Sequence, residues 1–371
     1  MERGIRRLTL RGYKSIRNLD GLELHDVNVL IGANGCGKSN FVSFFHLLRE
    51  LIEGRLAMAV NTAGGADTQL FLGPKVTKAI EARLEFGVNG YEFKLVPTAD
   101  DRLIFSDERI RFEGTPGYTL SVNRSLGSGQ SESTLKEQVE QSTKNKAISE
   151  HVYNAIASWT VYHFHDTSEA AAMRRSWSIR DSERLRADAG NLAPFLSNLL
   201  DANEPTYRLI VETIKLVAPY FKEFRFRPRK RAEDEVVQLE WTQEGSDYPF
   251  HPSQLSDGTL RFICLATALL QPNPPATILI DEPELGLHPF ALEILGDLIL
   301  QARERTQLIV STQSASLLNS FDPDHIIVVE REGGESQFKR LDQASLTDWL
   351  EEYTLGELWQ KNVYGGGPTH G

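Results

Sequence analysis

Residues 32–39, with the sequence G-A-N-G-C-G-K-S, constrain the fold more than any other part of this 371-residue chain. They match the pattern G-x-x-x-x-G-K-[ST] of a phosphate-binding loop. The apolar run Val27–Ile31 before them predicts a strand, and aromatic and apolar residues at helical spacing predict a helix over 40–53. Strand, loop and helix in this order are the context in which the motif functions, so a chance match in a glycine-rich turn is disfavoured.

This loop is expected to hold the phosphates of a nucleotide. Its glycines let the backbone approach phosphate oxygens, and the helix N-terminus points free N–H groups at them. Lys38 is expected to reach the β- and γ-phosphates, and the Ser39 hydroxyl to ligate Mg²⁺. The expected cofactors are therefore ATP and Mg²⁺. The predicted nucleotide-binding residues of this segment are Gly32, Ala33, Asn34, Gly35, Cys36, Gly37, Lys38, Ser39 and Asn40.

A second apolar run, residues 277–280, leads into the sequence D-E-P-E. At the tip of a buried strand, Asp281 is expected to hold Mg²⁺ directly or through water. Glu282 beside it is expected to act as the general base for an attacking water. The alternative is an acidic turn after a core strand, which the phosphate-binding loop makes less favoured.

The sequence L-S-D-G-T, residues 255–259, precedes an apolar helix predicted over 258–270. The Ser256 hydroxyl and the N–H groups of Asp257 and Gly258 would lie at a helix N-terminus, which suits a second phosphate site. Taken alone, the segment is better explained as an ordinary helix cap. Its position between the phosphate-binding loop and the D-E pair favours the phosphate site.

Charge and cysteine content limit the classes of function. The formal net charge of −11 disfavours nucleic-acid binding over the whole surface but permits a local basic patch. Cys36 and Cys264 make no disulfide framework and suit a reducing compartment, so we expect a cytoplasmic protein. No apolar run approaches the roughly 18 residues of a membrane span, and we expect no membrane partner. For Cys36, inside the loop, a redox switch is the alternative to a small residue whose backbone acts.

Two basic stretches are candidate nucleic-acid sites. The first comprises Arg225, Arg227, Arg229, Lys230 and Arg231, which we call the basic run. Such a run can neutralise several phosphates of DNA or RNA, and a solvated edge strand guarded by charge is an equally good interpretation. The second stretch comprises Arg174, Arg175, Arg180, Arg184 and Arg186, for which a helix surface paired with acidic residues is slightly favoured.

The remaining pattern predicts an α/β fold with a mostly parallel sheet, a flanking antiparallel layer and a helical lobe. Short apolar runs at 277–280 and 308–310, separated by a helix over 290–303, indicate a βαβ unit with buried parallel strands. A loop is expected over 61–69, a mobile insertion over 127–146 and a disordered end over 365–371. The expected antiparallel strands are residues 5–13, 19–24, 80–86, 90–96, 102–105 and 109–112. The expected elements of the lobe are helices at 148–158, 191–200 and 206–217 and strands at 160–164, 224–231 and 236–241.

The order phosphate-binding loop, L-S-x-G, then D-E resembles the ATP-binding-cassette (ABC) ATPases, in detail the branch containing RecF, the SMC proteins and the OLD-type ATPases. The opening L-R-G-Y-K-S-I at 10–16 is similar to that branch's first strand, and L-S-D-G-T-L-R corresponds to its L-S-G-G-Q signature, with Asp257 and Thr259 as departures. E-L-G-L-H-P at 284–289 is similar to the loop after the Walker B strand. Stand-alone predicted bacterial ATPases share Y-H-F-H-D-T-S at 162–168, L-x-x-D-x-G-N-L ending at Leu192, and G-E-L-W at 356–359.

We call residues 255–259 the Ser256 loop. The resemblance implies a head-to-tail homodimer with ATP between the phosphate-binding loop of one subunit and the Ser256 loop of the other. Gln313 stands where the family has its switch residue, often histidine; glutamine can orient water or contact the γ-phosphate but cannot shuttle a proton. By order along the chain, the family's Q-loop glutamine falls at His165 and Asp166, with Gln69 a weaker candidate.

We expect residues 1–60 to carry the Walker A part of the ATPase head, 61–150 the antiparallel strands and insertion, 151–245 the helical and signature lobe, 246–335 the signature, Walker B and switch part, and 336–371 a tail.

The expected function is ATP hydrolysis that switches a dimer between closed and open states. Its output is expected in a DNA transaction such as repair or anti-phage defence, with a nuclease or other effector protein as partner. The alternative is a slowly hydrolysing scaffold that regulates such a partner. A transporter motor is a third class, which the RecF-like opening argues against.

Overall fold

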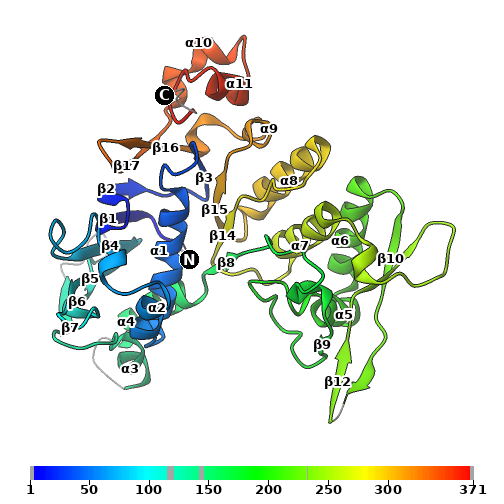
Figure 1. Cartoon of the computed structure of the whole chain (residues 1–371), viewed down its shortest axis with the longest axis horizontal. Coiled ribbons are helices and arrows are strands. Elements are labelled where there is room, and N and C mark those ends of the chain that lie inside the picture. Colours follow the sequence, from blue (N-terminus) through cyan, green and yellow to red (C-terminus); the bar gives the residue numbers. More distant parts are fainter. Residues whose placement is uncertain (1–3, 115–120, 142–145, 232, 368–371) are drawn as a thin grey trace.

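The phosphate-binding strand lies inside a six-stranded sheet with the order β17-β16-β3-β15-β14-β8. The computed structural model describes residues 4–114, 121–141, 146–231 and 233–367 (Figure 1). All neighbouring pairs in this sheet are parallel except β16–β17, which confirms the mostly parallel sheet. Its inner strands β3 and β15 are buried along their whole length, because helices and a second sheet cover both faces. The strands are β3 (Val27–Ile31), β8 (Thr160–Tyr162), β14 (Thr277–Asp281), β15 (Gln307–Thr312), β16 (Ile326–Glu332) and β17 (Glu335–Arg340).

A second six-stranded sheet is antiparallel throughout, in the order β2-β1-β4-β5-β6-β7. Helix α1 (Lys38–Ile52) lies between the two sheets (Figure 1). Its buried side chains, among them Phe41, Phe44 and Phe45, belong to one core cluster with residues of both sheets. The helix that begins at the phosphate-binding loop is thereby fixed from two sides. The strands are β1 (Arg7–Tyr13), β2 (Ile16–Glu23), β4 (Ile80–Phe86), β5 (Asn89–Pro97), β6 (Leu103–Phe112) and β7 (Val122–Gly127).

Three expectations for the antiparallel region were wrong. The loop expected over 61–69 begins inside helix α2 (Leu56–Thr62), and the two strands expected at 102–105 and 109–112 are one strand, β6. The insertion expected over 127–146 contains helix α3 (Leu135–Glu140) and the start of α4 (Lys146–Ala157); residues 142–145 lie outside the described residues.

Glu108 of β6 explains the ordered start of that insertion. Its buried carboxylate accepts hydrogen bonds from Tyr91 Oη (2.6 Å), Ser133 Oγ (2.5 Å) and Thr134 N (3.1 Å). Because a buried carboxylate needs several donors, these bonds hold residues 133 and 134 against the sheet. Polar composition alone gave no sign of this anchor.

A helical lobe lies beside the main sheet (Figure 1), and its buried side chains belong to one core cluster with residues of that sheet. Its helices α5 (Leu192–Ala202), α6 (Glu204–Val217) and α7 (Asp257–Leu270) pack on one another, and from Thr259 onward every residue of α7 is buried. Each of the two strands expected at 224–231 and 236–241 is split between two small sheets, β10-β13 and β11-β12-β9. Pro228 separates β10 from β11 because proline has no N–H to donate to a ladder. These strands are β9 (Trp177–Ser178), β10 (Phe221–Arg225), β11 (Arg229–Arg231), β12 (Asp234–Val237) and β13 (Glu240–Gln243).

The other helices cover the main sheet and end the described chain. Helix α8 (Pro289–Ala302) completes the expected βαβ unit between β14 and β15. Short helices α9 (Ala315–Leu318), α10 (Thr347–Leu350) and α11 (Leu355–Gln360) follow, with α11 packed on α9. Of the end expected to be disordered, 368–371 lies outside the described residues. In the described part of the chain, no helix is long and apolar enough to cross a membrane.

Candidate nucleotide site

Three parallel strands place predicted site residues at one edge of the main sheet, and a fourth ends beside them. In parallel strands that pair in register, the carboxyl ends meet at the same edge, and here β3 leads into the phosphate-binding loop, β14 ends at Asp281, and β15 precedes Gln313. The fourth strand, β8, pairs with β14 so that Tyr162 faces Ile280, which places His163 next to the end of β14. This convergence is a property of the sheet order, since the four segments are far apart in the sequence.

The phosphate-binding loop adopts a conformation that requires glycine. Gly35 and Gly37 have φ angles of 78° and 117°, in the left-handed region. A Cβ on Gly37 would also lie 2.0 Å from Ser336 Oγ of the β16–β17 hairpin. Ser336 Oγ donates to Cys36 O (2.5 Å), so this hairpin supports the loop from behind. Cys36 is buried there, which fits a small residue whose backbone acts.

Lys38 is folded back into the loop. Its Nζ donates to Gly32 O (2.6 Å) and Ala33 O (3.3 Å), and only 4% of the residue is exposed. The ammonium group is therefore held at the rim of a cavity of about 130 Å³. Residues of the loop and of two other strand ends line this cavity: Asn34, Gly35, Gly37, Lys38, Ser39, Asn40, Glu282 and Gln313. The structure thus brings the predicted loop residues together with both predicted catalytic residues.

Asp281 has a carboxylate oxygen that no described residue contacts through a hydrogen bond. Its Oδ1 is buried and has no hydrogen-bond partner among the described residues, and the same holds for Oγ of Ser311, which pairs with it across β14 and β15. Buried carboxylate oxygens are normally paired, because desolvation without a partner costs free energy. An orphaned oxygen donor at the strand tip fits a hard cation such as Mg²⁺, as predicted for Ser39 and Asp281.

Two carboxylates and one glutamine form a compact group beside this oxygen. Gln313 Nε2 donates to Glu282 Oε1 (2.5 Å), and Gln313 N donates to Glu284 Oε1 (2.6 Å). Glu282 has a φ of 44°, a strained conformation for a residue other than glycine, which its N–H supports by donating to Ser311 O (2.7 Å). Strain held by tertiary contacts is typical of functional sites.

Glu284 and His163 were not predicted as site residues. Burial raises the pKa of Glu284, while the backbone hydrogen bond from Gln313 acts in the opposite direction. Burial also lowers the pKa of His163, whereas the nearby charge of Asp281 raises it. The repeated glutamate in D-E-P-E and the histidine directly after an apolar strand are the sequence signals that could have identified them.

The three candidates for the Q-loop position are absent from the described residues that line the cavity, and the Q-loop assignment stays a prediction. Gln69 is buried, with 2% of it exposed, and its Nε2 donates to Thr68 Oγ1 (2.9 Å), away from the cavity. The backbone oxygen of His165 accepts a hydrogen bond from Arg261 Nη2 (3.1 Å). Asp166 is exposed, and the hydrogen bonds from Ser168 lower its pKa. His163, rather than these three residues, lies at the end of β8 beside Asp281.

Ser256, Asp257 and Gly258 do not lie at this cavity in the single chain. Among the described residues that line the cavity, none belongs to 255–259. Ser256 is the N-cap of α7, with its Oγ accepting from Thr259 N (3.1 Å), and Thr259 Oγ1 in turn contacts Tyr220 Oη (3.1 Å). The geometry is that of a helix cap, with free backbone N–H groups at Asp257 and Gly258 still directed out of the helix end.

The N-terminus of α7 is packed against the loop that follows β14. A Cβ on Gly258 would lie 2.3 Å from Gly286 O, so this contact requires glycine. Buried Arg261, one turn further along α7, donates to Leu285 O and also to Phe164 O (Nε, 2.9 Å). One side chain therefore ties α7 to the loop after β14 and to the segment after β8.

The basic run is not a continuous surface. Arg225 lies on β10 and pairs with Glu223 (2.9 Å), whereas Arg229 lies on β11 and pairs with Glu240 (2.6 Å). Arg227 also faces Glu240, at 3.7 Å. Lys230 and Arg231 are exposed, and in the described part of the chain neither forms an ion pair. Neutralisation of the three arginines favours the charge-guarded edge over an extended nucleic-acid site.

The second arginine stretch does not form the helix surface that was expected. Arg174 ends a short 3₁₀ turn (Ala172–Arg174), and the other four arginines lie on turns and loops. Arg186 pairs with Asp181 and Asp188, both at 3.5 Å, as expected for paired surface charge. Arg174 is instead buried and contacts the Ser256 loop. The helix prediction for this stretch was therefore wrong, and Arg174 is the member that holds another loop in place.

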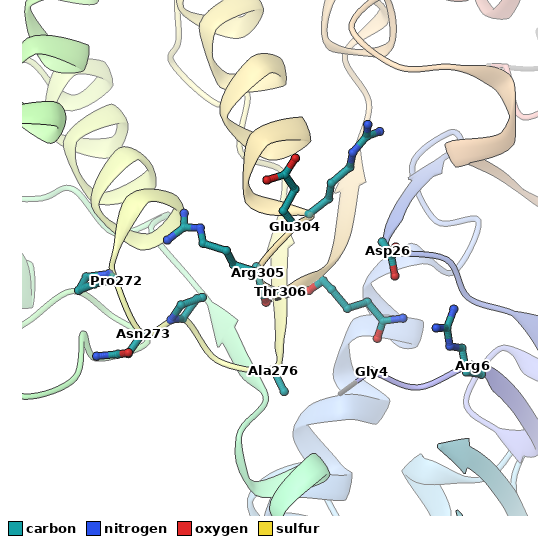
Figure 2. A pocket seen from close by; sticks show the side chains of 12 residues that line it. Gly4, Arg6, Asp26, Pro272, Asn273, Ala276, Glu304, Arg305 and Thr306 are labelled. Atoms are coloured by element: carbon teal, nitrogen blue, oxygen red, sulfur yellow. Dashed lines mark hydrogen bonds between the residues drawn. The ribbon is translucent and has the colours of Figure 1, made fainter. Parts of the chain in front are cut away.

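A larger hollow, of about 730 Å³, lies at the opposite edge of the main sheet (Figure 2). Asp26, Ala276 and Thr306 in its wall all precede strands, so it faces the amino ends of the strands and not the phosphate-binding loop. Arg305 extends toward the loop of Pro272 (Figure 2) and donates to Gln271 O (2.7 Å) and Leu269 O (2.8 Å), the last carbonyls of α7. We interpret Arg305 as a helix cap rather than part of a ligand site.

Comparison with known proteins supports the fold that these contacts build. Residues 27–319 match the family described as "AAA domain, putative AbiEii toxin, Type IV TA system". No curated protein sequence matches the chain. An SMC head bound to the C-winged helix domain of ScpA is similar in structure with a TM-score of 0.60 and 16% identity, over 93% of this chain and 99% of that one. An Smc head with an extended coiled coil, bound to the C-terminal domain of ScpA derived from Pyrococcus furiosus, gives 0.57 and 17%, over 94% and 99%. The predicted α/β P-loop fold of the ABC and SMC type is confirmed.

Proposed function

The chain belongs to this family of AAA domains, and we propose that it is an enzyme that binds ATP and Mg²⁺ and hydrolyses ATP to ADP and phosphate. The single observation that carries the proposal is the cavity at the carboxyl edge of the main sheet. Lys38, Glu282 and Gln313 reach it from three different strands, next to the orphaned oxygen of Asp281. A cation, a base and a hydrogen-bond donor around one phosphate-binding loop are what phosphoryl transfer to water requires.

Each group has a separate task in this proposal. Lys38 binds the β- and γ-phosphates, and Ser39 with Asp281 would hold Mg²⁺, which when bound neutralises phosphate charge. Glu282 accepts a proton from the attacking water at its carboxylate. Gln313, already 2.5 Å from Glu282 Oε1, orients that carboxylate and donates to the water or to a phosphate oxygen.

The Ser256 loop is proposed to act on the site of a second copy of the chain. Ser256, Asp257 and Gly258 do not line the cavity of their own chain, yet they present a helix N-terminus that suits phosphate. A head-to-tail homodimer would place this loop against the phosphate-binding loop of the partner. ATP would then stabilise the closed dimer, and hydrolysis would open it.

We further propose a DNA transaction, such as repair or anti-phage defence, as the output of this switch. The exposed Lys230 and Arg231 at the edge of the lobe are the local support for contact with nucleic acid. The two similar SMC heads were solved with ScpA domains bound, which supports an effector protein, such as a nuclease, as partner of this chain. The cytoplasm is the proposed location.

A second candidate is a slowly hydrolysing scaffold that regulates such an effector. The observation that favours it is the bond between Gln313 and Glu282, because this amide occupies one oxygen of the proposed base and cannot shuttle a proton. Steady-state turnover separates the two candidates. A turnover below about 1 s⁻¹, the lower end for typical enzymes, together with ATP-dependent dimerisation favours the scaffold.

The proposal is tested with Glu282→Gln, followed by light scattering with and without ATP. The variant should bind ATP, hydrolyse it at least about a hundredfold more slowly than wild type, and accumulate as a dimer. Adding Ser256→Arg should abolish the accumulation, because arginine is too large for close approach of the second chain. An ATP-independent mass for Glu282→Gln would contradict the switch. If wild type is a constitutive dimer, crosslinking between cysteines placed near Ser39 and Ser256 replaces the mass, and only an ATP-dependent crosslink between different chains supports the shared site.

A further inference from the structure

Asp257 places a negative charge where the proposed function needs phosphate to bind. It is the first residue of α7, directly after Ser256, and 67% of its side chain is exposed. A carboxylate close to nucleotide phosphate repels it, and like charges facing one another across an interface weaken association strongly. The Ser256 loop therefore requires a compensating charge if it is to approach ATP.

Arg174 supplies that charge from inside the lobe. Its Nη2 lies 2.8 Å from Asp257 Oδ1, while only 6% of its own side chain is exposed. The same guanidinium donates to backbone oxygens on both sides: to Pro252 O, to Leu255 O (3.5 Å) and to Thr167 O (2.9 Å). The arginine thus joins the Ser256 loop to the segment that leaves β8.

The position of Arg174 is fixed by its neighbours. Its own backbone oxygen accepts from Gln238 Nε2 (2.7 Å), and Met173 before it is buried against Cys264 of α7. All three nitrogens of this buried guanidinium donate hydrogen bonds, so it has little freedom to leave its partner. In the described part of the chain, Asp257 is the one carboxylate within ion-pair distance of it.

We propose that Arg174 is a positioning residue that neutralises Asp257 and thereby allows the Ser256 loop to accept the phosphates of ATP bound to a second copy of the chain. This inference rests on the proposed function. The pair carries no net charge, whereas removal of the guanidinium leaves a carboxylate at the helix N-terminus. The departure of Asp257 from a glycine-containing signature is then compatible with nucleotide binding because Arg174 accompanies it.

The test is a rescue experiment on the full chain, in a Glu282→Gln background that retains ATP. Arg174→Met keeps the apolar stem but removes the charge, and the dissociation constant of the ATP-bound dimer should rise at least about tenfold. Adding Asp257→Asn removes the stranded carboxylate, and the double variant should return to within about threefold of the parent. ATP affinity of the monomer should stay the same in each variant, because Arg174 does not line the cavity of its own chain.

Thermal unfolding, followed for each variant, shows that the chain is folded. A double variant as weak as Arg174→Met alone would overturn the inference, since Asp257→Asn does not restore the hydrogen bonds from the guanidinium to the backbone oxygens. An unchanged dimer in Arg174→Met would also overturn it. A parent without any ATP-dependent dimer would overturn the proposed function together with this inference, which distinguishes that failure from the other two.

Discussion

The phosphate-binding loop and the Ser256 loop both present a helix N-terminus to solvent, but they are held in place in different ways. The first combines contacts within a few residues, such as those of Lys38 with Gly32 and Ala33, with support from its own sheet, where Ser336 Oγ of the β16–β17 hairpin donates to Cys36 O. The second depends on Arg174 and Arg261, whose partners lie about eighty or more residues away in the sequence or on a different loop. The first loop is therefore held by its own residues and by the sheet that carries it, whereas a loop held by distant side chains moves with the elements that carry those side chains.

This difference predicts that damage to the first loop abolishes binding, while damage to the second affects association of two chains. Lys38→Ala should weaken ATP binding by about 3 kcal/mol, a little over a hundredfold in Kd, because the lysine carries the main positive charge at the cavity. Calorimetry measures the affinity directly. Lys14→Ala, outside the cavity lining but also adjacent to α1, is the control and should change the affinity little. An unchanged affinity in Lys38→Ala would mean that the loop does not bind nucleotide.

Gly258→Ala tests the second loop without altering its charge. The new Cβ would lie 2.3 Å from Gly286 O, so the N-terminus of α7 must move away from the loop after β14. We expect the ATP-bound dimer to weaken about tenfold in a Glu282→Gln background, with the ATP affinity of the monomer unchanged. The control is Gly333→Ala, where the new Cβ would lie in open space. Gly333 has a positive φ (57°), so this control carries a backbone cost that Gly258→Ala does not have. Equal effects of the two variants would argue against a role for the Gly258 contact.

The basic run offers a smaller effect that separates its paired from its unpaired members. Charge reversal of Lys230 and Arg231 should weaken DNA binding a fewfold and flatten its salt dependence by about 0.9 in the slope of log K against log salt for each phosphate that the variant no longer neutralises. Charge reversal of Arg225 and Arg229 serves as the comparison. These arginines pair with Glu223 and Glu240, so their reversal should disturb the structure of the lobe as well. Titrations at several salt concentrations provide the slopes. A wild type without salt-dependent binding to any DNA or RNA would reduce the run to a solvated edge.

The smallest expected effect concerns Glu284 and stability. Burial raises the pKa of Glu284 in the folded chain. The protonated side chain therefore stabilises the fold fully below the pKa of the unfolded chain, and this stabilisation is lost as pH rises through the folded-state pKa. Glu284→Gln cannot ionise and keeps an oxygen for Gln313 N, so at about pH 8 it should unfold roughly 2 °C above wild type, with no difference near pH 4.

Glu357→Gln is the opposite control for this measurement. Hydrogen bonds from Thr354 lower the pKa of Glu357. The ionised carboxylate therefore stabilises the fold above the pKa of the unfolded chain, and this stabilisation is lost as pH falls through the folded-state pKa. That variant should be less stable than wild type at pH 8. Melting curves measured across this pH range test both variants. A Glu284→Gln variant that is less stable than wild type at pH 8 would contradict the raised pKa of Glu284 in the folded chain.

Regular patterns were predictable where local periodicity agrees with tertiary burial. The β3 strand, α1, α7 and the β14–α8–β15 unit follow from apolar spacing, because elements buried on both faces leave continuous apolar runs. The errors fall where a single residue decides the local structure. Glu108 orders residues 133 and 134, and Pro228 divides the basic run between two sheets, and neither effect is visible in composition.

The sequence by itself determined the position of the phosphate-binding loop, of the carboxylate proposed to hold Mg²⁺ and of the proposed base, since each is a short motif at the end of a predictable strand. Only the tertiary structure decided that Glu282 and Gln313 share one cavity with Lys38, because the order β3-β15-β14-β8 brings together strand ends that are far apart in the chain. It also decided that the Ser256 loop stays away from that cavity and that Arg174 neutralises Asp257. The physical reason is common to these cases: a local motif fixes the backbone and charge of a few residues, whereas sheet order and buried long-range hydrogen bonds fix which charges meet.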